Sequence, residues 1–151
     1  MYDDASGGWR DVLQCPFFST TVLRMLGPKF IEQGFAANPP TAAIEHLVFC
    51  GSNGCIELAY ESEPLPPYRP VVLVTRALPD DPRSRAESVP LWFLIPEDAP
   101  CRNYWQWTFR SEEELEPVLE RLWEEIIVPY AIPTAAESER LTAAIMEFAR
   151  S

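Results

Sequence analysis

Lysine and histidine are nearly absent from this chain of 151 residues, which contains one of each, Lys29 and His46. A phosphate-binding loop needs a lysine after its glycine-rich turn and then a helix, so the turn at residues 51–54 does not predict a nucleotide site. Nucleophilic catalysis needs a base near a thiol or hydroxyl, and neither a Gly-x-Ser-x-Gly nor a Ser-x-x-Lys pattern occurs. We therefore expect a non-enzymatic protein without a cofactor.

Long hydrophobic runs are also missing. The longest, residues 71–74 and 91–95, are far shorter than the roughly 20 apolar residues that a membrane helix needs. Residues 1–8 are acidic and glycine-containing, which predicts a flexible tail, and they lack the basic start and apolar stretch of a secretory signal. These features predict a cytoplasmic protein that does not interact with membranes.

Basic side chains are scarce compared with acidic ones. The chain has 12 Lys and Arg against 23 Asp and Glu, and its formal net charge is −11. Nucleic-acid binding depends on basic side chains that displace counterions from phosphates, so we expect no nucleic-acid partner. The acidity is explained most simply by solubility, but it also favours encounter with a basic protein.

The four cysteines are too few and too scattered for a disulfide framework. Cys50 and Cys55 flank the turn at residues 51–54, and two registers are open. A four-residue loop would place the two cysteines opposite each other, whereas a two-residue Asn53-Gly54 turn would leave them unpaired. Because Asn-Gly is a strong hairpin signal, we favour unpaired cysteines. His46 and Cys50 on one strand would be roughly 13 Å apart, so they cannot share a metal ion, and we predict no metal site.

Hydrophobic periodicity predicts an α+β fold of one domain over residues 1–151. A helix at residues 16–33 buries Leu23, Leu26 and Phe30, with Gly34 as its left-handed cap and a kink near Gly27. Alternating residues then predict a hairpin of residues 44–50 and 55–61, whose glutamates face outward. Further strands are expected at residues 71–77, 91–95 and 104–109.

Two helices are predicted at the C-terminal end. The first begins at the capping box of Ser111 and Glu114 and is ended by Pro129 and Pro133; a second capping box, Thr134 with Glu137, begins the last helix. The order predicts an antiparallel sheet of about five sequential strands, with one N-terminal and two C-terminal helices packed on it. The helices either divide between the two faces or leave one face for a homodimer.

Two surfaces are candidates for function. The first is a stripe of glutamates on the helix after Ser111, which is suited to a basic protein partner in an antidote, adaptor or chaperone-like subunit. The second is a group of tryptophans, which could line the pocket of a small-molecule-binding or metal-binding protein, including an enzyme, or anchor a homodimer. The stripe is Glu113, Glu116, Glu120 and Glu124, and the tryptophans are Trp92, Trp105 and Trp107.

Overall fold

The computed structural model describes residues 15–37, 46–61, 67–76 and 87–151. Five strands form one sheet in the order of the sequence, and each pairs with the next in antiparallel fashion. The strands are β1 (Ala36–Ala37), β2 (His46–Cys50), β3 (Gly54–Glu61), β4 (Arg69–Arg76) and β5 (Ser88–Pro90). The predicted α+β class and the antiparallel sheet of sequential strands are confirmed.

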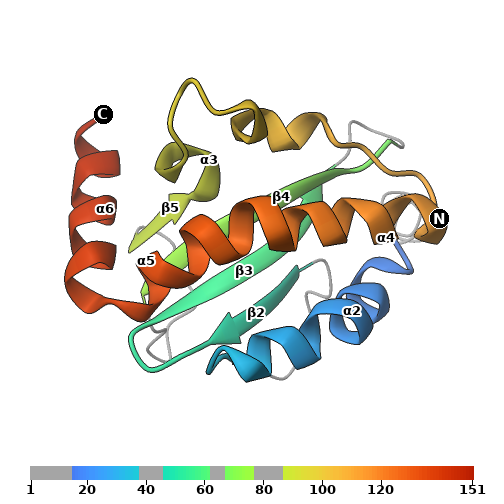
Figure 1. Ribbon diagram of the computed structural model, residues 1–151, viewed down its shortest axis with the longest axis horizontal. Coiled ribbons are helices and arrows are strands. Elements are labelled where there is room, and N and C mark those ends of the chain that lie inside the picture. The colour runs from blue at the N-terminus through green and yellow to red at the C-terminus, as the bar shows by residue number, and fades with distance from the viewer. Residues whose placement is uncertain (1–14, 38–45, 62–66, 77–86) are drawn as a thin grey trace, which may run out of the picture.

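Helices make up most of the rest of the described chain. They are α2 (Phe18–Glu32), α3 (Leu91–Leu94), the 3₁₀-helix η2 (Pro100–Gln106), α4 (Glu112–Arg121), the π-helix η3 (Leu122–Ala131), α5 (Ile132–Ala136) and α6 (Ser138–Arg150). Figure 1 shows α2 and the continuous run from α4 to α5 lying over the same face of the sheet, with α6 beside α5 and β5. None of the described helices is long and apolar enough to cross a lipid bilayer.

The core lies between α2, η3 and the sheet. Phe30 of α2 stacks on Phe49 of β2 at 4.1 Å between ring centroids and meets the edge of Trp123 in η3 at 5.0 Å. Leu26 and Phe30 are buried as predicted, but Leu23 is 39% exposed, and Val22 takes its place in the buried stripe. The stripe therefore follows i, i+4 spacing along one side of the helix.

Helix α2 runs through Pro28 to Glu32 without a break. Gly27 precedes the proline and has no Cβ to collide with the proline ring, so the helical conformation is accessible there. Gly34 has a φ of 87°, as expected for a glycine that closes a helix in the left-handed conformation.

Two predicted strands are wrong. Residues 91–95 include the short helix α3, in which Leu91 is fully buried and Trp92 is 37% exposed, and Ile95 follows with 2% exposure. Burial four residues apart is a helical pattern, whereas the apolar run alone cannot distinguish a buried strand from a buried helix. Residues 104–106 belong to η2, and Phe109 forms only an isolated bridge with Tyr68.

Glu57 corrects the prediction that the glutamates of the hairpin face outward. It is only 6% exposed, because it lies in the central strand β3 between Val48 of β2 and Leu73 of β4. Glu61, at the end of the same strand, is exposed.

The long C-terminal helical run corrects another prediction. Ser111 caps α4 as expected, since its Oγ accepts a hydrogen bond from the Glu114 N–H at 3.2 Å. The chain then stays helical past Pro129 and Pro133, where the sequence predicted an end. The wider π-helical turns fit this change, because they separate a proline ring from the carbonyl that it would meet in an α-helix. Thr134 is buried in α5 and does not cap α6.

Candidate functional site

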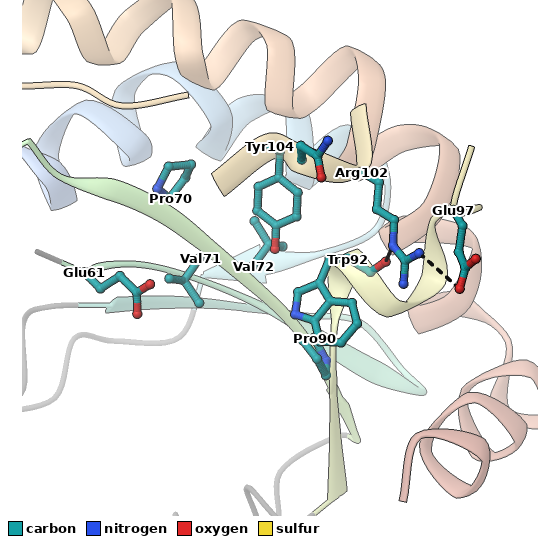
Figure 2. Close-up of a pocket in the computed structure, with 10 residues that line it drawn as sticks. Glu61, Pro70, Val71, Val72, Pro90, Trp92, Glu97, Arg102 and Tyr104 are labelled. Carbon is teal, nitrogen blue, oxygen red and sulfur yellow. Dashed lines mark hydrogen bonds and ion pairs between the residues drawn. The ribbon is translucent and has the colours of Figure 1, made fainter. Parts of the chain in front are cut away.

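A pocket of about 600 Å³ lies at the outer edge of β4, beyond the point where β5 ends. Figure 2 shows Glu61 at one end of the pocket, Arg102 and Glu97 at the other, and Trp92 and Tyr104 between them. The residues that line it are Glu61, Pro70, Val71, Val72, Pro90, Trp92, Glu97, Arg102, Asn103 and Tyr104.

A gap in the strand ladder creates this pocket. Tyr68 exchanges two backbone hydrogen bonds with Phe109, of 2.9 and 3.0 Å, and pairing with β5 begins only at Leu73, opposite Pro90. In an antiparallel ladder, residues two apart turn their backbone polar groups to the same side, so Pro70 and Val72 face the gap as Tyr68 does. Pro70 has no N–H to satisfy, which makes proline suitable at an open strand edge.

Tyr104 closes part of the gap from η2. Its side chain is buried at 3% exposure, and its hydroxyl oxygen accepts hydrogen bonds from the backbone N–H groups of Val72 and Trp92. The N–H of Trp92 lies in the first turn of α3, where a helix has no internal acceptor. One hydroxyl thus satisfies a strand edge and a helix start together.

Burial, together with a smaller contribution from the nearby Glu61 carboxylate, raises the pKa of Tyr104 to about 12, although the two backbone hydrogen bonds oppose the shift. The hydroxyl therefore stays protonated at neutral pH. It can position a ligand through hydrogen bonding, but it cannot act as a base there.

Arg102 is fixed at the other end of the pocket. Its guanidinium carbon lies 5.6 Å from the ring centroid of Trp92, and its Nε donates a hydrogen bond to the Trp92 carbonyl oxygen at 3.3 Å. Its Nη1 is 3.6 Å from Oε1 of Glu97. Arg102 therefore reaches the pocket with its orientation already set by Trp92.

The three predicted tryptophans do not form one group. Trp92 lines the pocket, whereas Trp107 is half-buried and lies under Arg121, whose guanidinium carbon is 3.9 Å from its ring centroid. The Trp105 side chain lies outside the described structure. Since Trp92 and Trp107 are not on strands, they are not on a bare sheet face, contrary to the basis of the homodimer hypothesis.

The predicted glutamate stripe is only partly unpaired. Glu116 forms an ion pair with Arg24 of α2 at 2.8 Å, and Arg24 also reaches Glu112 at 3.3 Å. Within the described part of the chain, no ion pair is seen for the exposed side chains of Glu113, Glu120 and Glu124. The stripe therefore carries less uncompensated charge than the sequence predicted.

The hairpin turn has the register that the sequence analysis did not favour. Cys50 lies opposite Cys55, and the two form a disulfide. Asn53 and Gly54 serve other contacts: Asn53 Nδ2 donates to the Ala136 carbonyl at 2.6 Å, and a Cβ on Gly54 would lie 2.7 Å from Leu141 and 2.9 Å from the Ala135 oxygen. The Asn-Gly pair thus serves close packing against α5 and α6.

Metal ligands do not gather in the described residues, where no group of three His, Cys, Asp or Glu side chains could hold an ion. Cys15 and Cys101 are the free thiols. Cys15 is 6% exposed, and burial raises the pKa of its thiol to about 11, although the backbone of Phe17 and Phe18 hydrogen-bonds to it and opposes the shift.

We expect Cys15 to resist thiol reagents in the folded protein. At neutral pH a thiol with a pKa of about 11 is ionised in about one molecule in ten thousand, and burial also blocks access. Peptide mapping after brief labelling should show Cys101, which is half-buried, modified first, and Cys15 only after unfolding. Equal labelling rates for the two would contradict the burial.

The same shift predicts a direction for stability at alkaline pH. The raised pKa means that the unfolded thiol, with its ordinary value of 9.0, loses its proton first. The contribution of Cys15 is therefore complete below pH 9 and is lost as the pH rises towards about 11. In urea titrations over this range, a Cys15→Ala variant should lose less stability than the parent.

Sequence reasoning missed most of the residues that make the pocket. It identified Trp92, but Glu97, Arg102 and Tyr104 were not marked as site residues by any pattern, and Glu61 was predicted only as an outward-facing residue of the hairpin. Tyr104 was noted only as part of an aromatic strand that is not formed.

Comparison with protein-family models, with curated proteins and with solved structures gives no match for this chain.

Proposed function

We propose that this protein binds a small organic molecule in the pocket beside Tyr104. The observation that carries the proposal is the convergence of polar groups from separate elements on a pocket with apolar walls. Glu61 comes from β3, Arg102 and Tyr104 from η2, and Val71 and Trp92 provide apolar surface. A volume of about 600 Å³ falls within the usual range for ligand pockets.

The proposal is binding without chemistry. The polar side chains among the described residues that line the pocket are carboxylates, an arginine, an asparagine and a tyrosine, and none of these described residues is a cysteine, serine or histidine. The tyrosine is held in its protonated form by burial. These groups can orient a ligand through charge and hydrogen bonds, and the apolar wall supplies most of the binding energy.

Filling the pocket should abolish binding without unfolding the protein. We expect a screen of small organic fragments to find compounds that raise the melting temperature of the parent and not of Val71→Phe, because Val71 is half-buried and lines the pocket. A ligand present at about 100 times its Kd should stabilise by about 2.7 kcal/mol, which is a shift of several degrees.

Leu73→Phe is the matched control. Leu73 is also half-buried on β4, on the same face two residues along, but it does not line the pocket. Hits should stabilise this variant as they stabilise the parent. A screen without stabilising compounds, or hits that bind Val71→Phe equally well, would contradict the proposal.

A second candidate function is docking of a basic protein on the glutamate stripe. It is favoured by Glu113, Glu120 and Glu124, which are exposed along α4 and η3. Binding to such a surface should weaken steeply with salt.

Charge reversal tests the second candidate. Changing Glu113, Glu120 and Glu124 to lysine should weaken binding of a synthetic basic amphipathic helix by at least about tenfold at low salt, because three attractive charges become repulsive. The control changes Asp98, Glu139 and Glu147 to lysine, which alters the net charge equally at other exposed sites. Equal losses in both triple variants would mean that only net charge matters and would exclude a specific surface.

A further inference from the structure

The two ends of the pocket differ in charge, because Glu61 lies at one end and the ion pair of Arg102 and Glu97 lies at the other. Glu61 stands at one end, close enough to Tyr104 for its charge to raise the pKa of the hydroxyl. Arg102 stands at the other end, beyond Trp92 (Figure 2). An anionic group on a ligand would be repelled at the Glu61 end, whereas at the other end it can bind Arg102 in place of Glu97, so an anionic ligand has one favoured direction of binding.

The side chain of Arg102 is held in an orientation that suits binding of an anion. Its side chain is 22% exposed, and its contacts with the ring and the carbonyl of Trp92 hold the guanidinium plane in place. A guanidinium that is already oriented and partly removed from water gives a planar anion two parallel hydrogen bonds with little loss of side-chain entropy. Carboxylate is the organic anion whose plane and oxygen spacing match this fork.

Glu97 is the present partner of the Arg102 guanidinium, and it is held there only weakly. The distance between its Oε1 and Nη1 of Arg102 is 3.6 Å, which is an ion pair but not a hydrogen bond, and its side chain is 91% exposed. A carboxylate so fully hydrated loses little when it moves into water, and exposed pairs of this kind contribute little stability. Glu97 is therefore a displaceable counter-ion.

We propose that the pocket selects a small carboxylate with an apolar body, whose carboxylate replaces Glu97 on Arg102 while its body lies against Trp92 and Val71. This inference rests on the proposed function, since it names the class of ligand for the same pocket. On the guanidinium the carboxylate of the ligand takes the place of the Glu97 carboxylate, which moves into water but remains on the chain.

If the carboxylate of the ligand replaces Glu97 on Arg102, substitutions of Arg102 and of Glu97 should have opposite effects on the affinity for the ligand. Arg102→Gln should weaken binding of a carboxylate by at least about tenfold, because a charge-assisted pair of hydrogen bonds is lost. Glu97→Gln should strengthen it by about threefold, because the competing anion is gone. A residue that merely supports the pocket would not improve binding when its charge is removed.

The experiment measures binding of phenylpropanoate, its primary amide and the corresponding primary amine by isothermal titration calorimetry. The parent should prefer the acid to the amide by at least about tenfold, and Arg102→Gln should remove that preference. Arg102→Lys, which keeps the charge without the planar fork, should give an intermediate preference.

Glu87→Gln is the control for Glu97→Gln. Glu87 pairs with Arg76 at 3.5 Å, a similar distance, but neither residue lines the pocket. It should leave acid binding unchanged, whereas Glu97→Gln should raise it. Since Glu97 is almost fully exposed, its variant is expected to fold normally even if Arg102→Gln does not.

The outcomes separate the two levels of proposal. If the probes or fragments bind but the acid is not preferred, or if Glu97→Gln weakens acid binding, the carboxylate inference is overturned and the pocket remains a ligand site. If neither the three probes nor any fragment binds in a way that Val71→Phe blocks, both fail.

Discussion

Phe30→Ala is expected to lower the free energy of unfolding by about 3–5 kcal/mol, the range for truncating a fully buried phenylalanine. Phe30 is fully buried, stacked on Phe49 at 4.1 Å and set against the edge of Trp123 at 5.0 Å. It therefore contacts the sheet and η3 at once, and the cavity left by alanine would be bounded by two rigid rings that cannot collapse into it.

Urea denaturation of the parent and the variant measures this loss. Ile31→Ala is the matched control, because Ile31 is the next residue of the same helix and is 66% exposed. It should change the free energy of unfolding by less than about 0.5 kcal/mol. If the two substitutions had similar effects, Phe30 would not be the centre of the core, and the packing of α2 on the sheet would be wrong.

The parts of the fold that the sequence predicted correctly are those with a long, one-sided pattern. Five apolar residues of α4 and η3 repeat at helical spacing, and all of them are buried: Leu115, Val118, Leu119, Leu122 and Ile126. The last helix likewise buries Leu141 and Ile145. In such segments the apolar residues recur at the helical period because one side of the helix is buried. The sequence pattern alone therefore predicts both the helix and its buried side.

The predictions that are wrong concern residues whose positions depend on contacts with distant parts of the chain. Gly54 packs closely against Ala135 and Leu141, which are distant from it in the sequence. A glycine that is needed for such a contact looks the same in the sequence as a glycine that is needed for a tight turn. Glu57 shows alternation but is buried, because the strand occupies the middle of the sheet. A local pattern shows which side chains share a face, but it does not show what covers that face.

The pocket could not be predicted for a related reason. It exists because β5 is only three residues long and leaves the outer edge of β4 without a strand partner between Tyr68 and Leu73. The length of a strand is difficult to predict from a sequence, and here residues 91–95 were themselves predicted as a strand. A pocket at a strand edge follows only once the chain is known to turn into a helix at Leu91.

Tyr104→Phe is expected to lower the free energy of unfolding by about 2–4 kcal/mol, because it leaves two buried backbone donors, the N–H groups of Val72 and Trp92, without their acceptor. The loss should fall on the edge of β4 and the start of α3, so hydrogen exchange at these two amides should accelerate more than exchange in β2. Tyr130→Phe, at a half-buried tyrosine that does not line the pocket, is the control and should have little effect.

The pH dependence distinguishes this role of Tyr104 from simple packing. Its pKa is raised from 10.0 to about 12, so the unfolded tyrosine ionises first, and the parent loses stability as the pH rises between these values. Phenylalanine cannot ionise, so the difference in stability between parent and variant should shrink over this range, while Cys15 affects both proteins equally. A difference that stayed constant up to pH 12 would mean that the hydroxyl is not buried at the strand edge, and the polar wall of the proposed pocket would have to be abandoned.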